Sequence, residues 1–207
     1  MSEYLESFAI DTPDPLLSSI KEQALTMKVP IIKTETLAFI EQLIMVAKAE
    51  LILEIGGGIG YFAIQVVKKT KTMVTSIEID EGLHKVAKAN IEASGLASKI
   101  TSINADALAL ETSSLGLFDM IFVDGAKGKY RAYFDKFKDI LKVGGFFVFD
   151  NLLFRGQVAN PETILSRNRR QLVNKIKSFN TFIMNVLDYR TEIYPLGDGI
   201  ALAIKLR

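Results

Sequence analysis

Short apolar runs alternate with amphipathic helical patterns from residue 51 to residue 149, and this alternation constrains the fold more than any other feature. Five apolar runs are typical of buried strands, at residues 51–55, 73–77, 99–103, 118–123 and 145–149. The segments between them carry apolar side chains three and four residues apart, as in 62–69 and 130–141. Strands and helices that alternate at this spacing form βαβ units, so the sequence predicts an α/β fold with a mostly parallel, doubly wound sheet.

The two ends of the chain extend this core. Residues 14–49 have the pattern of two helices, and another helix is expected around residues 162–178. Residues 181–187 and 199–206 are apolar or alternating, and a turn-rich segment joins them. We expect these two runs to pair as a hairpin, which gives a seven-stranded sheet an antiparallel C-terminal edge.

The length and organisation of the chain indicate one domain. The chain has 207 residues, and no repeat or linker-like stretch divides it. We therefore expect a single domain over residues 1–207, with helices in residues 1–49 and the doubly wound core in residues 50–207.

The composition excludes several classes of protein. Lys and Arg number 25 against 24 Asp and Glu, a formal net charge of +1, so overall charge does not indicate a binder of nucleic acid or membranes. Cysteine is absent, which excludes disulfide frameworks, thiolate metal sites and cysteine nucleophiles. The single histidine, His84, excludes multi-histidine metal sites. We expect it to be an ordinary surface or core residue.

The N-terminal residues do not resemble an export signal. Glu3, Glu6 and Asp11 come before the first basic residue, Lys21, which is the reverse of a charged segment followed by an apolar run. No apolar run reaches the roughly 18 residues that a membrane span needs. We therefore expect a cytoplasmic protein without a membrane partner.

A glycine-rich loop follows the first predicted strand. Gly56, Gly58 and Gly60 come directly after Glu54-Ile55. In an open α/β sheet, ligands bind beyond the carboxyl ends of the strands near the point where strand order reverses. Glycines let the backbone approach a ligand closely, although a tight turn alone also needs glycine.

Acidic residues at the ends of the next two strands indicate a nucleoside ligand. Glu78 ends the second run, where a carboxylate can accept hydrogen bonds from both ribose hydroxyls, and Asp106-Ala107 follows the third, where it can reach an adenine edge. No Lys-Ser/Thr pair follows the glycines, so this is not a phosphate-binding P-loop. Glu54 would repel a pyrophosphate but suits a sulfonium or an α-amino group. S-adenosylmethionine therefore fits better than NAD.

Three oxygen-bearing side chains end the fourth and fifth strands. Asp124 follows one strand and Asp150-Asn151 the other. We expect these strands to be adjacent, so the side chains converge as a site for a hard cation such as Mg²⁺ or Ca²⁺. Lys127, three residues after Asp124, is a candidate general base. The alternatives are a simple turn at Asp150-Asn151, a helix cap at Asp124 and a solvated Lys127.

Longer motifs now carry a specific resemblance. The segments 54–60, 118–130 and 150–156, together with Val29-Pro-Ile-Ile32, resemble the metal-dependent O-methyltransferases of the catechol and caffeoyl-CoA type. This implies a Rossmann-like class I S-adenosylmethionine-dependent methyltransferase fold and a homodimer. Where relatives often carry Ser or Thr, this chain has Phe62.

The resemblance also assigns roles to residues. Asp124, Asp150 and Asn151 would be ligands of Mg²⁺ or another divalent cation, and Lys127, beside Asp124, would be the catalytic base. The S-adenosylmethionine pocket would be lined by Ile32, Glu54, Gly56, Gly58, Gly60, Phe62, Glu78, Asp106, Ala107 and Asp124. The metal would hold two neighbouring substrate oxygens and acidify the hydroxyl that attacks the methyl group, with positioning supplying most of the rate enhancement.

A basic stretch bears on the substrate. Between residues 155 and 177 there are six basic residues, among them Arg155, Arg167, Arg169 and Arg170, and one acidic residue. With its Arg167-Asn-Arg-Arg170 stretch the chain resembles small bacterial members, the transfer-RNA 5-hydroxyuridine methyltransferases, which form 5-methoxyuridine at the wobble position. This resemblance favours transfer RNA over a small catechol as the substrate. The 5-hydroxyl and 4-carbonyl oxygens of that base are neighbours, as in a catechol, and an anticodon loop can present the base unstacked.

Other interpretations stay open at this point. The basic stretch also fits a solvated helix face, and small catechol-like molecules satisfy the same two-oxygen requirement. An NAD-dependent dehydrogenase would explain the glycine loop and Glu78 but leave Asp124, Asp150 and Asn151 without a role. A non-catalytic RNA-binding domain would explain the arginines but not the predicted metal ligands.

Overall fold

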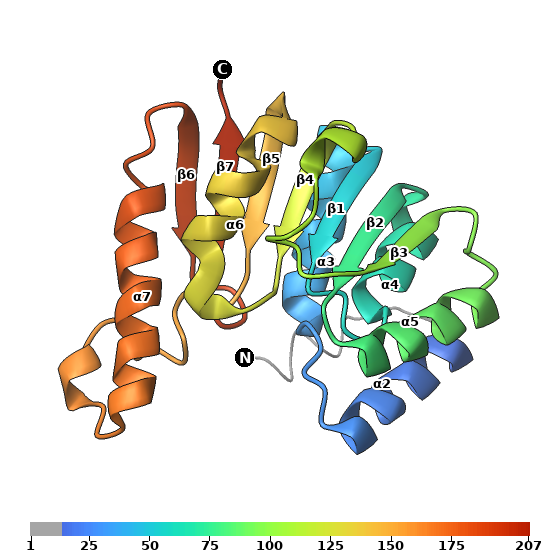
Figure 1. The fold of residues 1–207 in the computed structure, drawn as a ribbon, viewed down its shortest axis with the longest axis horizontal. Coiled ribbons are helices and arrows are strands. Elements are labelled where there is room, and N and C mark those ends of the chain that lie inside the picture. Colours follow the sequence, from blue (N-terminus) through green and yellow to red (C-terminus); the bar gives the residue numbers. More distant parts are fainter. Residues whose placement is uncertain (1–13) are drawn as a thin grey trace.

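The computed structural model of this protein describes residues 14–207, which fold around one seven-stranded sheet (Figure 1). The strands are β1 Leu51–Ile55, β2 Met73–Glu78, β3 Ile100–Asn104, β4 Phe118–Val123, β5 Leu141–Phe149, β6 Tyr189–Tyr194 and β7 Ile200–Lys205. Their order in the sheet is β3-β2-β1-β4-β5-β7-β6. Glu3, Glu6 and Asp11, on which the expectation about export rests, lie outside the described residues.

The pairing confirms the predicted sheet. β1 pairs in parallel with β2 and β4, and β2–β3 and β4–β5 are also parallel pairs. β7 lies antiparallel between β5 and β6. The fold is thus α/β, with a mostly parallel sheet and an antiparallel C-terminal hairpin.

Helices cover both faces of the sheet (Figure 1). They are α2 Pro15–Met27, α3 Thr34–Ala47, α4 Tyr61–Thr70, α5 Glu81–Ala93, α6 Tyr130–Phe137 and α7 Arg167–Ile183. The first four pack on one face, and α6 and α7 pack on the other. Local signals set the helix starts: Asp14 accepts hydrogen bonds from Leu16 N and Leu17 N, and Asp80 accepts one from Leu83 N.

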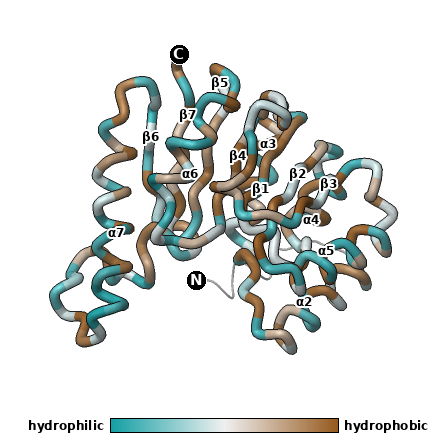
Figure 2. The backbone as a smooth tube through the Cα atoms, in the orientation of Figure 1, coloured by the Kyte–Doolittle hydropathy of each residue, from teal (hydrophilic) through white to brown (hydrophobic). Residues whose placement is uncertain are grey.

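The core follows the alternation of side chains along the strands. On β4, Met120 and Phe122 face α2–α5, whereas Ile121 and Val123 face α6 and α7, and all four are at most 1% exposed. Such strands are apolar on both sides because helices cover both faces. Figure 2 shows the same pattern as hydrophobic colour along β1 and β4.

The C-terminal helix and the strand after it correct the sequence prediction. The pattern predicts a helix over 162–178 and a strand over 181–187, but α7 runs from Arg167 to Ile183 and β6 begins at Tyr189. The side chains that α7 buries recur every three or four residues, at Val173, Ile176, Phe179 and Ile183. This is helical spacing, so packing on the sheet continues the helix as far as Ile183, into the first three residues of the segment predicted as strand.

The boundary between α6 and β5 also differs from the prediction. The helix predicted over 130–141 ends at Phe137, a 3₁₀ turn covers Lys138–Ile140, and β5 starts at Leu141 rather than residue 145. Leu141 pairs with Phe118 on β4, and a register shift separates this pair from the rest of the ladder. Pairing with β4 therefore extends β5 at its N-terminal end, to Leu141.

The point where strand order reverses lies between β1 and β4. In the sheet, β2 and β3 lie on one side of β1, whereas β4 and then β5 lie on the other. The carboxyl ends of these strands carry the glycine loop and Asp124. This is the ligand-binding position of a doubly wound sheet. Over residues 14–207, none of the helices combines the length and the apolar character required to cross a bilayer.

Candidate active site

A cavity of about 820 Å³ opens at the carboxyl ends of β1, β2, β4 and β5. It brings together most of the predicted site residues, which come from seven separate segments of the chain. Those that line it are Ile32, Gly56, Gly58, Glu78, Asp106, Ala107, Asp124, Lys127, Asp150, Asn151, Arg155 and Arg169.

The glycine loop passes directly against the end of β4. Gly56 has a φ of +97°, and a Cβ there would lie 2.7 Å from the backbone oxygen of Asp124. The amides of Gly56 and Gly57 both donate to Ile77 O, at 2.9 and 3.1 Å. Glycine at position 56 is thus required by close backbone approach as well as by conformation.

Glu78 is fixed by two backbone amides at the end of β2. Gly58 N donates to Oε2 and Asp80 N donates to Oε1, each at 2.8 Å. The side chain is buried but lines the cavity. Its remaining lone pairs are therefore available to hydroxyl donors of a ligand.

Glu54 is a buried carboxyl group beneath the loop. It is 1% exposed, and burial raises its pKa to about 8, although a hydrogen bond with Ser76 opposes the shift. Its Oε2 has no hydrogen-bond partner among the described residues. Glu54 and Phe62 line a small recess of about 30 Å³ beside the main cavity, and the Phe62 ring stacks on Phe122 at 4.2 Å between centroids.

The two residues predicted to lie beside the adenine, Asp106 and Ala107, also line the cavity. Ala107 is buried, and Asp106 accepts a hydrogen bond from Leu108 N at 2.9 Å. Lys129 Nζ lies 3.7 Å from Asp106 Oδ2. Gly60 does not line the cavity; it is the N-cap residue of α4, and a Cβ there would contact Ala87.

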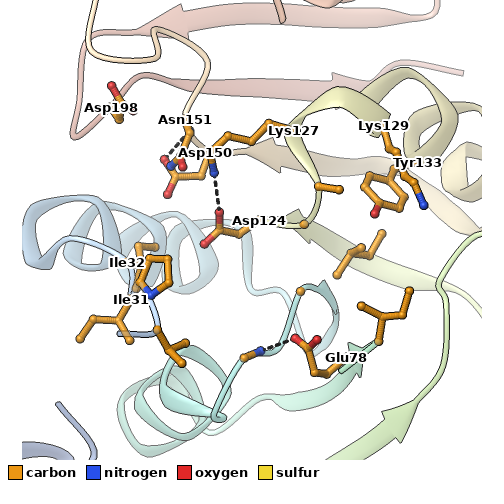
Figure 3. A pocket seen from close by; sticks show the side chains of 18 of the residues that line it. Ile31, Ile32, Glu78, Asp124, Lys127, Lys129, Tyr133, Asp150, Asn151 and Asp198 are labelled. Carbon is orange, nitrogen blue, oxygen red and sulfur yellow. Dashed lines mark hydrogen bonds and ion pairs between the residues drawn. The ribbon is translucent and has the colours of Figure 1, made fainter. Parts of the chain in front are cut away.

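The predicted metal ligands converge from β4 and β5. Figure 3 shows Asp124, Lys127, Asp150 and Asn151 grouped at one end of the cavity, with Glu78 at the other. Lys127 Nζ lies 3.8 Å from Asp124 Oδ1, and Asn151 N donates to Asp150 Oδ1 at 2.6 Å. The buried Tyr130 hydroxyl donates to Asp150 O at 2.7 Å and fixes this backbone.

Ionising both Asp124 and Asp150 in this group costs free energy, because both carboxyl groups are buried and close together. Burial raises the pKa of Asp124 to about 7, Asp150 adds to the shift, and Lys127 opposes it. Burial raises the pKa of Asp150 as well. Two carboxyl groups and an amide form the set; no cluster of three or more His, Cys, Asp or Glu suited to a metal occurs within residues 14–207.

The four predicted RNA-binding arginines separate into two pairs. Arg155 and Arg169 line the cavity, and Arg169 Nε donates to Gln157 Oε1 at 3.0 Å. Arg167 and Arg170 are exposed on the first turn of α7 and do not line the cavity. The basic stretch thus borders the site through one pair only.

The sequence did not indicate several further residues that line the cavity, among them three polar or aromatic residues near the predicted site. Tyr133, Phe154 and Asp198 line it, and Asp198 comes from the turn between β6 and β7. Only the helical spacing of Tyr133 from Tyr130 could have suggested its position. His84 does not line the cavity; its Nδ1 lies 3.0 Å from Ser102 Oγ.

Comparisons with known sequences agree with this geometry. The profile of the O-methyltransferase family matches residues 12–206. Caffeoyl-CoA O-methyltransferase 1 of Nicotiana tabacum is 30% identical over 179 residues, which cover 81% of this chain and 74% of the relative. Tapetum-specific methyltransferase 1 of Arabidopsis thaliana is 27% identical over 217 residues, 98% of this chain and 91% of the relative.

Solved structures share the fold. A Staphylococcus aureus protein provisionally named caffeoyl-CoA O-methyltransferase has a TM-score of 0.91 and 31% identity, with 98% of each chain covered. An O-methyltransferase of Bacillus cereus, solved in complex with SAH, has a TM-score of 0.82 and 23% identity over 98% of this chain and 96% of that one. Since the family profile spans nearly the whole chain, this protein belongs to the O-methyltransferase family.

Proposed function

We propose that this protein transfers a methyl group from S-adenosylmethionine to a hydroxyl oxygen that has a second oxygen beside it, with a divalent cation such as Mg²⁺. The observation that carries the proposal is the placement of Asp124, Asp150, Asn151 and Lys127 in the same cavity as Glu78. Family membership supports the reaction type. A dehydrogenase or a non-catalytic RNA-binding domain would leave the first four residues unexplained.

The described residues fit S-adenosylmethionine. Glu54 offers a buried carboxyl oxygen without a partner, next to the glycine loop, which suits the α-ammonium group. Glu78, held by Gly58 and Asp80, suits the ribose diol, because a fixed carboxylate can accept two hydroxyl donors. Ile32 and Ala107 add apolar surface. The cofactor supplies an electrophilic methyl group.

The residues at the other end fit a hard divalent cation. Two carboxylates and one amide oxygen are the donor types that Mg²⁺ prefers. The raised pKa values of Asp124 and Asp150 reflect the cost of holding both charges together, which a cation would remove. A bound cation would hold the two neighbouring substrate oxygens and favour ionisation of the hydroxyl.

Lys127 is the residue that would remove the hydroxyl proton. Its Nζ lies 3.8 Å from Asp124 Oδ1, so the amine reaches the oxygen-rich end of the cavity. Tyr130 fixes the backbone that carries Asp150, which keeps the ligand oxygens in place. Charge is dispersed during methyl transfer, so orientation of the two reactants supplies most of the rate enhancement.

As the specific substrate we propose 5-hydroxyuridine at the wobble position of transfer RNA. Its 5-hydroxyl and 4-carbonyl oxygens are neighbours, as the ligand arrangement requires. Arg155 and Arg169 at the cavity could neutralise phosphates beside the modified base. A small catechol-like molecule, which also has two neighbouring oxygens, is the second candidate; the Nicotiana tabacum relative is named for caffeoyl-CoA.

One experiment compares both candidates. The purified protein is incubated with labelled S-adenosylmethionine, Mg²⁺ and either transfer RNA that contains 5-hydroxyuridine or caffeoyl-CoA and simple catechols. Mass spectrometry of the nucleosides should reveal 5-methoxyuridine. Methylation of the catechols without transfer-RNA methylation would replace the substrate proposal, and absence of any methyl transfer would contradict the proposed reaction.

We also propose that the protein is a homodimer, which light scattering on the purified protein can test.

A further inference from the structure

The segment from Asn151 to Gly156 has an uncommon backbone. Asn151, Phe154 and Arg155 have φ values of 62°, 45° and 56°, and Gly156 has 76°. Left-handed conformations are unfavourable for side chains with a Cβ and persist only where the surroundings hold them. Something outside this segment must therefore fix its shape.

The turn between β6 and β7 supplies the contacts. Leu152 N donates to Gly199 O and Leu153 N to Asp198 O, both at 2.8 Å. Arg155 N donates to Asp198 Oδ1, so Asp198 binds the segment through its backbone and its side chain. A Cβ on Gly199 would lie 2.3 Å from Leu153 Cγ, so the segment can rest on the turn only because residue 199 is glycine.

Asp198 also faces the cavity. Figure 3 places it beyond Asn151, on the side away from Glu78. Asp198 holds the amides of Leu153 and Arg155, on either side of Phe154, and both Phe154 and Arg155 also line the cavity. Arg155 and Asp198 are 43 residues apart in the sequence. The Asp198 carboxylate thus joins the turn between β6 and β7 to the segment after β5.

We propose that Asp198 is the positioning residue for the substrate side of the active site. Its carboxylate keeps Arg155 N paired, and this pairing holds the Phe154 ring and the Arg155 guanidinium at the cavity wall. That this wall faces the methyl acceptor rests on the function proposed above, whereas the contacts by which Asp198 holds the segment do not.

Hydrogen exchange in the wild-type protein gives the first test, without any substrate. The amide of Arg155 should exchange at least tenfold more slowly than those of Phe154 and Gly156, for which no acceptor is found within residues 14–207. Equal exchange at Arg155 and Phe154 would overturn the proposal.

Variants give the second test. Asp198→Ala should lose this protection and raise KM for the methyl acceptor at least tenfold, while the Kd for SAH changes less than twofold. Asp198→Asn keeps an oxygen acceptor and should restore both properties. Asp188→Ala is the matched control, because Asp188 is an exposed carboxylate that pairs with Arg207.

The outcomes separate the proposal from its alternatives. A parallel loss of SAH affinity and thermal stability in Asp198→Ala, without rescue by Asp198→Asn, would mean that Asp198 only supports the fold and would overturn the positioning role. If Asp198→Ala does not fold, Asp198→Asn decides: wild-type protection and KM support the role, and loss of either contradicts it. Exchange and SAH binding remain informative even if the methyl acceptor proves to be different.

Discussion

The amide of Gly58 donates to Glu78 Oε2 at 2.8 Å and so joins the glycine loop after β1 to the end of β2. Gly58 has a φ of +53°, so the loop turns its amide towards the carboxylate in a left-handed conformation. Glu78 therefore has two tasks, because it shapes the loop and lines the cavity. Affinity for the cofactor should depend on this one carboxylate more than on any glycine alone.

Replacement of Glu78 by Gln should weaken SAH binding at least tenfold. Hydrogen bonds to a charged acceptor are worth about 1.5–3 kcal/mol, and Gln keeps only one acceptor oxygen because its other terminal atom is an NH2 donor. Isothermal titration calorimetry measures the effect. Glu81→Ala is the control, since Glu81 is exposed and pairs with Lys85. An unchanged Kd in Glu78→Gln would show that the ribose lies elsewhere.

Removal of a proposed metal ligand should separate turnover from cofactor binding. Asp150→Ala should reduce methyl transfer below detection, and excess EDTA should do the same to the wild type, because both remove the group that orients the acceptor oxygens. The Kd for SAH should stay within about threefold. Full activity in EDTA would remove the divalent cation from the mechanism.

Stability of the ligand-free protein should fall between about pH 4.5 and pH 8 because of Glu54. Its pKa is about 8 in the folded state against 4.5 in the unfolded state, so the folded protein holds the extra proton. Within this window the unfolded state is already ionised while the folded state keeps the proton, so each pH unit lowers the unfolding free energy by up to about 1.4 kcal/mol.

Urea unfolding at several pH values checks this prediction. Asp124 and Asp150 contribute with the same sign, so the comparison with Glu54→Gln isolates one residue. The variant should have a flatter dependence of unfolding free energy on pH than the wild type. Identical slopes would mean that burial does not raise the pKa of Glu54.

The two arginine pairs should differ in their effect on transfer-RNA methylation. Arg155→Ala with Arg169→Ala should raise KM for transfer RNA and lower the log–log salt dependence of binding by about 0.7–0.9 for each lost phosphate contact. Arg167→Ala with Arg170→Ala changes the net charge equally but leaves the cavity wall intact. It should therefore have the smaller effect.

Kinetics at two salt concentrations, on transfer RNA and on a catechol, complete that test. If the two double variants raise KM for transfer RNA equally, the arginines attract RNA only through their overall charge. An equal effect on both substrates would mean that the pair shapes the pocket and does not contact RNA.

The sequence alone determined the central sheet and most of the site. Buried strands flanked by helices must be mostly apolar on both faces, so β1 and β4 appear in the sequence as apolar runs that only Glu54 and Asp119 interrupt. Chemically informative residues such as Glu78 and Asp124 end such runs. Because the carboxyl ends of parallel strands meet at one edge of the sheet, their convergence followed from the order of elements.

Only the tertiary structure decided the C-terminal third and the far wall of the cavity. Residues 181–187 are ambiguous between helix and strand, and packing of Phe179 and Ile183 on the sheet made the segment up to Ile183 helical. The role of Asp198 depends on a hydrogen bond to Arg155 N, 43 residues away. No local pattern encodes such a contact, because it arises where the antiparallel hairpin brings its turn against the segment after β5.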